Sequence, residues 1–556
     1  MSEITNLEPK RVFYYFDEIC KIPHGSGNTK AISDYLVDFA KEHGLRYRQD
    51  ALNNVIIWKD GKGKPVIIQG HMDMVCEKEP DCTKDMDKEG LDLYIDGNEL
   101  KAKGTTLGGD DGIAVAMALA LLEADDPELP PLEAVITVDE EVGMLGAASI
   151  DLSDVEGRTM LNIDSEDEGV FTVSCAGGTM AHTSVDVNRE KVANAGGTYK
   201  LSITGLVGGH SGVEIHKNRA NAIELLGKSL RRLQDDIGIR LVDIKGGAKD
   251  NAIAVSSSAI FTVDQASRVS CSGICDLCRT NSEEGEKDKE DILNSMKYGF
   301  IIGDANAKLQ ALKDRLMPNE DELLEKTIAI IKESIAIEYA TTDPDIEILC
   351  KPIDPNSILF KDEVPTAGRL HPMTIESTNQ VINLITCNPN GIQRMSPDVE
   401  GLVQTSLNMG ILKTCREVLP GDLIADDRIM LTFCVRSSVE SEKESLMRKL
   451  RDITLAIGGN ISFEGNYPGW KYAVESPLRD LMIDVYKEQY GKDPKVEAIH
   501  AGVECGYFAS KLEGLDCVSF GPDLKEIHTF RESLDIESTE RTYKLTLEVL
   551  HRLANM

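Results

Sequence analysis

Residues 66–76 read VIIQGHMDMVC: an apolar, largely β-branched run ends in a glycine, and His71 and Asp73 follow with one residue between them. The apolar run is typical of a buried β-strand. In an extended segment His71 and Asp73 point to the same side. The carboxylate can then accept the proton of one imidazole nitrogen and direct the other nitrogen toward a metal ion. A hydrogen-bonded histidine at a strand end explains the pair equally well, so a metal site requires ligands from elsewhere in the sequence.

The pattern on both sides of this stretch predicts an α/β domain. Helices are predicted at 28–43 and 112–124, and strands at 55–58, 66–69, 134–138 and 160–163. The C-terminal part returns to the alternation, with a helix at 477–490, a strand near 516–520 and a helix at 538–553. Strands separated by helices favour a mostly parallel central sheet flanked by helices. Such sheets place their chemistry at the carboxyl ends of the strands.

Composition excludes several classes of partner. A chain of 556 residues predicts two or three domains. Its net charge of -34 repels nucleic acid and anionic membrane surfaces, so we expect neither as a partner.

The N-terminal residues resemble no signal peptide, and the longest strongly apolar run, Ile113–Leu122, is too short to span a bilayer. Thirteen scattered cysteines favour reduced thiols and a cytoplasmic location.

A second candidate segment, GTTLGGDDGIAVAMALALLE at 104–123, carries Asp110 and Asp111 between glycines at the start of a predicted helix. Aspartate is a good helix N-cap, which explains one carboxylate in this position. Capping does not explain two adjacent carboxylates. Because different oxygens can serve each purpose, capping and metal binding are compatible.

Two further strands end in carboxylates. AVITVDEEVGMLGA, at 134–147, places Glu140 and Glu141 after its apolar run, and MLNIDSEDEG, at 160–169, ends its strand at Asp164. Neighbouring side chains of an extended segment point apart. One glutamate can therefore face a metal ion while the other faces a substrate.

A histidine far along the chain adds to these candidates. VSFGPDLKEIHTFRES, at 518–533, places His528 in a loop after a strand. The mixture of imidazole and carboxylate suits zinc, or manganese and cobalt where the supply of metal ions differs. Five such side chains are enough for two metal ions bridged by one carboxylate: His71, Asp110, Glu141, Asp164 and His528.

Seven motifs now stand in order along the chain: GHMDMV, TLGGDDG, VDEEVGMLGA, NIDSEDEG, GGHSGVEIH, HAGVECG and GPDLKEIH. With them, the sequence resembles the aminoacylhistidine dipeptidases, also called cytosolic non-specific dipeptidases or bacterial carnosinases, of the dinuclear-zinc aminopeptidase/carboxypeptidase clan. The resemblance runs from about residue 8 to residue 550, with 265–345 as its main gap.

The resemblance implies two divalent metal ions, with zinc expected and cobalt or manganese as alternatives. It assigns His71 and Asp164 to one ion, and Glu141 and His528 to the other. Asp110 would bridge the two ions, because it directly follows the glycine pair. Asp111 would then lie behind the ligands rather than among them.

The resemblance also implies catalytic and substrate-binding roles. Asp73 would orient His71, and Glu140 would be the general base for the attacking water. His210, in GGHSG, would help to stabilise the oxyanion. Asn251, in GGAKDNAIA, and Arg436, in CVRSS, would hold polar groups of the substrate. An arginine fits the free C-terminal carboxylate of a peptide by a bidentate pair.

The family architecture predicts an α/β catalytic domain formed by residues 1–186 and 470–556. An α+β lid and dimerisation domain, 187–469, would be inserted in it. A charged, cysteine-containing insertion lies near 265–345, with helical patterns at 304–316 and 320–337. No internal repeat is apparent in the sequence. We expect a homodimer through the lid, acting on short peptides with free ends, Xaa-His dipeptides among them.

Three alternatives stay open. An aminoacylase or a tripeptidase of the same clan would use the same chemistry, and a non-catalytic relative would bind peptides or metals only. Cys271, Cys275 and Cys278 have the C-x3-C-x2-C spacing of an iron–sulfur cluster that works with S-adenosylmethionine. Their place in mid-chain, and Leu277 where an aromatic residue is usual, favour ordinary reduced thiols instead.

Overall fold

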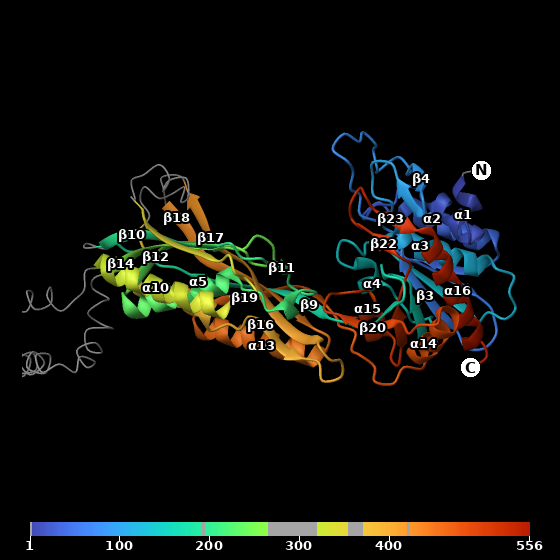
Figure 1. The fold of residues 1–556 in the computed structure, drawn as a ribbon. Coiled ribbons are helices and arrows are strands. Elements are labelled where there is room, and N and C mark those ends of the chain that lie inside the picture. The colour runs from blue at the N-terminus through green and yellow to red at the C-terminus, as the bar shows by residue number, and fades with distance from the viewer. Residues whose placement is uncertain (1–2, 192–194, 265–319, 354–370, 420–422) are drawn as a thin grey trace, which may run out of the picture.

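The structure, a computed structural model, describes residues 3–191, 195–264, 320–353, 371–419 and 423–556. Two lobes are visible in Figure 1, and both termini lie in the same lobe. Cys271, Cys275, Cys278 and the helix predicted at 304–316 lie outside the described residues.

An eight-stranded sheet forms the centre of the lobe that holds the termini. In spatial order its strands are β1 (Arg46–Gln49), β2 (Val55–Lys59), β6 (Leu132–Thr137), β3 (Val66–His71), β7 (Thr159–Asn162), β21 (Asp516–Ser519), β8 (Val170–Cys175) and β20 (Lys495–Ile499). The four central strands β6, β3, β7 and β21 run parallel, whereas β1 and β2 pair antiparallel at one edge. The mostly parallel sheet confirms the predicted α/β class.

Helices cover both faces of this sheet because successive strand residues point to opposite sides. Ile68 lies in one hydrophobic cluster and Ile67 in another, and Ile57 and Ile56 divide in the same way. The first face packs against α1 (Lys10–Ile19), α2 (Lys30–Glu42), α3 (Gly109–Glu123), α14 (Pro477–Tyr490) and α16 (Ile536–Leu553). The second packs against α4 (Leu145–Ser149) and α15 (Cys505–Lys511).

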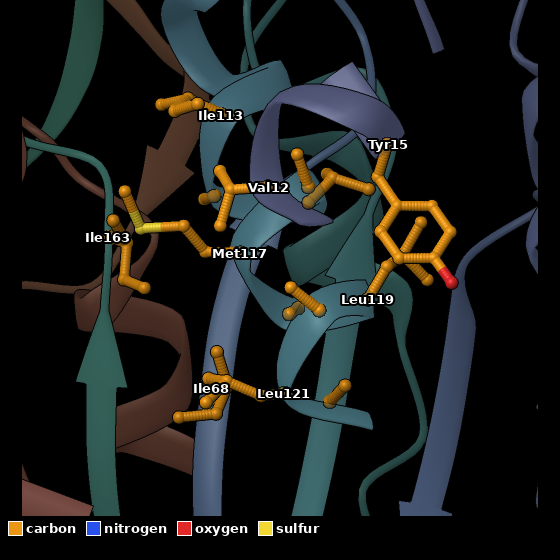
Figure 2. Packing of buried hydrophobic residues seen from close by; sticks show 14 of the residues in the cluster. Val12, Tyr15, Ile68, Ile113, Met117, Leu119, Leu121 and Ile163 are labelled. Atoms are coloured by element: carbon orange, nitrogen blue, oxygen red, sulfur yellow. The ribbon is translucent and has the colours of Figure 1, made fainter. Parts of the chain in front are cut away.

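The helix α3 is apolar on all sides and lies inside the lobe. Val12 and Tyr15 of α1 pack with Met117 of α3, and the same cluster includes Ile68 of β3 and Ile163 directly after β7 (Figure 2). A helix that is hydrophobic all round needs such neighbours on every side. The N-terminal end of α3 is therefore held in a fixed position against the carboxyl end of the sheet.

Most of the predicted elements of this lobe are confirmed, with bounds that differ by a few residues. A small sheet lies beside it, in the order β22 (Leu524–Lys525), β23 (Ser533–Asp535), β5 (Glu99–Ala102) and β4 (Leu93–Asp96). A short 3-10 helix, η1 (Glu3–Asn6), precedes α1. Among the described helices, none combines the length and the hydropathy that a membrane crossing needs.

A nine-stranded antiparallel sheet forms the other lobe, and its helices cover one face (Figure 1). In spatial order its strands are β15 (Glu347–Pro352), β10 (Ala195–Thr204), β14 (Ser257–Asp264), β12 (Ile239–Gly246), β17 (Val403–Leu419), β18 (Leu423–Ser437), β9 (Gly177–Asp186) and β19 (Asn460–Tyr467), with β16 (Gly391–Met395) paired to β17. The helices are α5 (Ala222–Asp236), α10 (Glu320–Glu338), α12 (Ile375–Thr386) and α13 (Glu440–Ala456).

This sheet contains the same topology twice. The first unit follows the order β9-α12-β17-β18-α13-β19, with its strands arranged as β19-β9-β18-β17. The second unit follows β10-α5-β12-β14-α10-β15 in the described residues, with its strands arranged as β15-β10-β14-β12. Each is a β-α-β-β-α-β unit in the same spatial order, and the second is inserted between β9 and α12 of the first. The repeat lies in the topology, because the sequence shows no internal repeat.

The predicted division of the chain at residues 186 and 469 stays a prediction. By its pairing with β18 and β19, β9 belongs to the nine-stranded sheet. The strand runs from Gly177 to Asp186, so the sheet of the second lobe starts about ten residues before residue 187. A small sheet of β11 (Gly209–His210) and β13 (Ala252–Ile253), and the 3-10 helix η2 (Ile215–Lys217), complete this lobe.

Candidate metal centre

Neighbouring parallel strands deliver the candidate ligands to one edge of the eight-stranded sheet. His71 is the last residue of β3, and Glu140 and Glu141 follow β6, its neighbour on one side. Asp164 follows β7, its neighbour on the other side. Because parallel strands end at the same edge, these side chains meet although they lie far apart in the sequence.

Asp110 joins two groups of donor atoms. Its Oδ1 lies 3.2 Å from His71 Nε2, which also lies 3.7 Å from Asp164 Oδ1. Its Oδ2 lies 3.2 Å from His528 Nε2, which is 3.0 Å from Glu141 Oε1. Each group of three offers donor atoms that lie within 4.8 Å of one another. One carboxylate therefore presents one oxygen to each of two adjacent donor sets.

The loop before α3 gives Asp110 its position. Glu532 is 3% exposed, and its carboxylate accepts four backbone N–H groups of this loop. The nitrogens of Leu107 and Gly108 lie 2.8 and 3.0 Å from Oε2, and those of Gly109 and Asp110 lie 2.8 and 3.3 Å from Oε1. Gly108 has a φ of +68°, a region that favours glycine. The glycine pair thus lets the backbone wrap around one buried carboxylate.

Asp111 lies behind His71. Its Oδ2 accepts the backbone N–H of His71 at 3.1 Å, and the residue is 2% exposed. A β-carbon on Gly70 would collide with the same carboxylate oxygen. Glycine at position 70 is therefore what allows Asp111 to reach the strand end, whereas Asp110 points toward the donor groups.

Asp73 contacts His71 through two groups. The backbone oxygen of Asp73 lies 3.0 Å from His71 Nδ1, and its Oδ1 lies 3.5 Å from the same nitrogen. The carboxylate also accepts the Ser26 hydroxyl at 2.8 Å and the Glu140 N–H at 3.1 Å. Asp73 thus connects the imidazole of His71 with the segment that follows β6.

The donor groups carry an excess of negative charge that a cation would balance. No lysine or arginine in the described ranges forms an ion pair with Asp110, Glu140, Glu141 or Asp164. Hydrogen bonds to Asp110 and Glu141 raise the pKa of His528 to about 10. Although burial lowers the pKa of His71, its carboxylate partners raise it well above the usual value. Both imidazoles thus carry the positive charge in the absence of a metal, so the donor set fits divalent cations.

Glu140 is the one carboxylate of the group with no side-chain partner among the described residues. Burial, and then the negative charges of Asp164 and Glu504, raise the pKa of Glu140 to about 9. Positive charge at the adjacent donor groups would reverse this shift. A buried carboxylate of tunable pKa beside a metal centre is typical of a general base.

His210 and Asn251 lie together in the second lobe. The backbone N–H groups of Gly212 and Val213 both point at His210 Nδ1, at 3.2 Å each. Because Nδ1 accepts, the ring is neutral and its proton lies on Nε2, which is left free to donate. Burial, and then the charge of Arg436, lower the pKa of His210, which agrees with a neutral ring. Asn251 is exposed, and its backbone oxygen accepts the N–H of Ser211 at 2.8 Å.

Arg436 is a buried cation that forms no ion pair with any carboxylate in the described part of the chain. It is 6% exposed, its Nη1 donates to the Tyr467 hydroxyl at 3.1 Å, and its Nε has no partner. A buried charge of this kind is costly unless an anion pairs with it. The guanidinium is therefore suited to a negatively charged group of a ligand.

Three residues of this region escaped the sequence analysis: Glu504, His500 and Glu532. Glu504 is fully buried, and its Oε2 accepts Gln69 Nε2 and Thr137 Oγ1, each at 2.6 Å. It therefore supports β3 and β6 just before they deliver their candidate ligands. Glu532 and Glu504 each occur in a motif quoted above or next to one, but no local pattern shows which backbone or strand they contact.

The Glu532 contacts lead to a first prediction. Glu532→Gln replaces one acceptor oxygen by an NH2 group that faces backbone N–H donors, so the loop that carries Asp110 loses its fixed position. Loss of such a supporting contact lowers metal affinity by about 10–100-fold. Titration of the metal-free protein with zinc, against a chromophoric chelator, measures this change.

Glu537→Gln is the matched control, because Glu537 lies on α16 with its side chain 71% exposed. This variant should bind zinc as the unchanged protein does. If Glu532→Gln also bound zinc with unchanged affinity, the carboxylate would not determine where Asp110 lies.

Comparison with known families decides the identity of the fold. The model of peptidase family M20/M25/M40 matches residues 67–554. The chain belongs to this family. It is a hydrolase, a metallopeptidase by family, and the match covers every candidate ligand and both lobes of the structure.

Two relatives of the M20/M25/M40 peptidase are similar over their whole length. The cytosol non-specific dipeptidase of Escherichia coli (strain K12) is 31% identical over 558 residues, which cover 100% of this chain and 99% of that protein. The crystal structure of aminoacylhistidine dipeptidase from Vibrio alginolyticus has a TM-score of 0.82 and 29% identity, covering 99% of this chain and 98% of that one. These relatives confirm the resemblance that the ordered motifs indicate.

A more distant structure shares the fold of the M20/M25/M40 peptidase. Aminopeptidase PepT from Bacillus cereus has a TM-score of 0.54 and 14% identity, covering 99% of both chains. The architecture of two lobes therefore extends well beyond the relatives of similar sequence.

Proposed function

We propose that this chain hydrolyses the peptide bond of dipeptides with two divalent metal ions and with Glu140 as general base. The position of Asp110 is the main support for this proposal, because its two oxygens face two separate donor groups. His71 and Asp164 would hold one ion, and Glu141 and His528 the other. Asp73 would orient His71 through the contacts to its Nδ1.

Two bound metal ions supply a water of lowered pKa and a polarised peptide carbonyl. The residues of the chain do the rest. Glu140 accepts the proton of the attacking water on its carboxylate and passes it to the nitrogen of the leaving amine. Its N–H bond to Asp73 ties the general base to the residue that orients His71.

His210 and Arg436 would bind two different polar groups of the substrate, the carbonyl oxygen of the scissile bond and the C-terminal carboxylate. The free Nε2–H of His210 can donate to the oxyanion that forms at the scissile carbonyl. Arg436 can pair with the free C-terminal carboxylate of the substrate, and exposed Asn251 can bind a further polar group. Because a dipeptide has its carboxylate one residue from the scissile bond, His210 and Arg436 would bind groups of the same short substrate.

Zinc is the proposed metal, because two imidazoles and three carboxylates suit it, with cobalt or manganese as alternatives. We further propose a cytoplasmic enzyme that uses peptides as its partners, with no nucleic acid or membrane in its function. We also propose that the chain forms a homodimer through its lid domain, and this proposal rests on the family resemblance.

A hydrolysis panel tests this function. Purified protein is given dipeptides, Xaa-His among them, tripeptides and N-acetyl amino acids, with and without a chelator. Dipeptide hydrolysis that the chelator stops supports the proposal. Preference for tripeptides or for N-acetyl amino acids would instead assign the chain to a tripeptidase or an aminoacylase, and inactivity toward all three would favour a binding protein.

The proposed contact between Arg436 and the C-terminal carboxylate of the substrate gives a second prediction. Arg436→Ala should lower kcat/KM for a dipeptide by about 10–100-fold, since it removes a charge-assisted pair. The same dipeptide as its C-terminal amide lacks the carboxylate, so its smaller kcat/KM should change little. Steady-state kinetics with both substrates measure the difference.

Arg428→Ala is the control, because Arg428 lies exposed on the same strand β18. It should leave both substrates unaffected. An equal loss for the peptide and its amide in Arg436→Ala would mean that the guanidinium supports the fold and does not bind the carboxylate.

A further inference from the structure

Two thiols lie in contact on the second face of the eight-stranded sheet. Cys505 is the first residue of α15, and Cys517 lies on β21. Both are buried free cysteines, and their Sγ atoms are 3.5 Å apart. The sulfur atoms of a disulfide are about 2.05 Å apart, so the two thiols need to approach by about 1.5 Å to form one. The pair is thus close enough to be joined after a small displacement.

A cavity of about 510 Å³ leads to one of the two thiols. Cys517 lines this cavity together with Trp470, whereas Cys505 is not among its lining residues. The exposed residues Lys471 and Ser510 line it as well, so a small solute can enter from the solvent. Cys517 is therefore the thiol that such a solute meets first, and Cys505 lies behind it.

Cys505 is protected from direct attack in a second way. Burial, and then the hydrogen bond with Cys517, raise the pKa of Cys505 well above its ordinary value. The thiolate is the form of cysteine that reacts as a nucleophile. Cys505 is thus suited to react second, after its neighbour has become an electrophile 3.5 Å away.

The thiol pair also lies next to a support of the candidate metal centre. Glu504 directly precedes Cys505, and its carboxylate accepts hydrogen bonds from β3 and β6 just before these strands deliver their candidate ligands. Cys517 pairs with a residue of β7, the strand that precedes Asp164. A bond that draws α15 toward β21 therefore displaces the carboxylate that holds two of the strand ends.

We propose that Cys505 and Cys517 form a reversible disulfide when a hydroperoxide enters the cavity, and that this bond weakens metal binding through Glu504. The bond itself needs only the two thiols and the cavity, so it does not depend on the proposed function. It would make the candidate metal centre responsive to oxidants.

The reaction has two steps. The Cys517 thiolate attacks one oxygen of the hydroperoxide, the O–O bond breaks, and an alcohol (water from hydrogen peroxide) leaves with the proton that Cys517 has lost. Cys517 is then a sulfenic acid. The sulfur of Cys505 attacks that of Cys517, the S–O bond breaks, and the oxygen leaves as water with the proton of Cys505. Two thiols are oxidised by two electrons in total, and the hydroperoxide takes up both electrons.

Peptide mapping after oxidation tests the bond. The full chain is treated with hydrogen peroxide, the remaining thiols are blocked, and the protein is digested with trypsin. Cleavage after lysine places the two cysteines in separate peptides, 496–511 and 512–525. We expect mass spectrometry to find these peptides joined, and dithiothreitol to separate them. No joined peptides at a peroxide concentration that oxidises the exposed Cys387 would overturn the proposal.

Two variants test the order of the steps. In Cys505→Ser, the sulfenic acid of Cys517 has no thiol to react with, so dimedone should label the peptide 512–525. In Cys517→Ser, the peptide 496–511 should stay unlabelled, because Cys505 is out of reach. A label on 496–511 would overturn the assigned roles. Thermal melting checks that both variants are folded, and Cys505→Ala replaces Cys505→Ser where serine is not tolerated in the buried position.

Cys175→Ser is the matched control. Cys175 is a third buried thiol of this region, and a β-carbon on Gly506 of α15 would lie 3.6 Å from its Sγ. This variant should form the disulfide between Cys505 and Cys517 as the unchanged protein does. Loss of the joined peptides in Cys175→Ser would make Cys175 the true partner and overturn the proposed pair.

Zinc titration tests the link to the metal centre. The oxidised protein should bind zinc about 10–100-fold more weakly than the reduced protein, as expected when a supporting contact of the ligands is lost. Treatment with dithiothreitol, followed by its removal, should restore the affinity. Cys517→Ser exposed to the same peroxide should keep its affinity, and an equal loss in both proteins would overturn the link.

Neither readout measures peptide hydrolysis. A chain that forms the disulfide and loses zinc affinity, but hydrolyses no peptide when reduced and loaded with metal, would refute only the proposed function. A chain that hydrolyses dipeptides, but forms no joined peptides, would refute only the disulfide. The two proposals therefore fail separately.

Discussion

Removal of divalent metal ions should abolish peptide hydrolysis by this enzyme, and returning zinc, cobalt or manganese should restore it; no other treatment should have a larger effect. The reason is the charge of the site, where carboxylates converge without a lysine or arginine partner among the residues that the structure describes. We expect about two metal ions per chain, measured by atomic emission on the purified protein. Activity is followed with a dipeptide before and after dialysis against a chelator.

Metal binding should also release protons. The raised pKa values of His71 and His528 mean that both imidazoles are protonated at neutral pH while no metal is bound. A metal ligand must be deprotonated, so zinc displaces these protons. Calorimetric titration of the metal-free protein in buffers of different ionisation enthalpy measures the release. One tightly bound ion per chain, with no second site, would contradict the role of Asp110 as a bridge.

The replacement Glu140→Gln should lower kcat by roughly 10²–10⁴-fold with KM nearly unchanged. Glutamine keeps the shape of the side chain but cannot accept the proton of the attacking water. The N–H bond from residue 140 to Asp73 uses the backbone and survives the change. Steady-state kinetics with a dipeptide, together with the metal content of the variant, give both quantities.

The neighbouring residue supplies the matched control. Glu141→Gln changes the same chemical group one position further along, where Oε1 faces His528. This variant should lose metal content as well as activity, whereas Glu140→Gln should keep both ions. Because Glu140 also lies in a donor group with His71 and Glu141, loss of metal from Glu140→Gln would make it a ligand in place of a base.

Four of the five candidate ligands that the structure brings together stand at a recognisable local feature of the sequence. His71, Glu141 and Asp164 follow apolar strand patterns, and Asp110 follows a glycine pair at a helix start. Parallel strands convert these separate features into one edge of a sheet, so a few strand ends are enough to define a cluster. His528 stands in a loop after a predicted strand, which is a weaker pattern, and the resemblance adds to it.

What the sequence does not reveal depends on contacts between distant segments. The four N–H groups that Glu532 accepts belong to a loop more than four hundred positions earlier, and nothing near Glu532 indicates them. The repeat of the second lobe is hidden for a related reason. Strand order in an antiparallel sheet is set by which edges pair, and hydrophobic patterns alone leave that order open. The same limit applies to β9, whose pairing places it in the second lobe while its pattern is that of any half-buried strand.

The position of β21 determines when the enzyme can first become competent during its synthesis. This strand lies between β7 and β8 and comes from the C-terminal part of the chain, as do His528 and Glu532. A nascent chain that has just completed the second lobe therefore has an open gap in its central sheet, lacks the candidate ligand His528, and has a loop without the Glu532 carboxylate. Closing that gap joins segments separated by several hundred residues, which is the slowest kind of contact for a chain to make. The candidate metal centre is thus complete only in the finished polypeptide, and we expect a ribosome-bound chain that lacks these segments to hydrolyse no peptides.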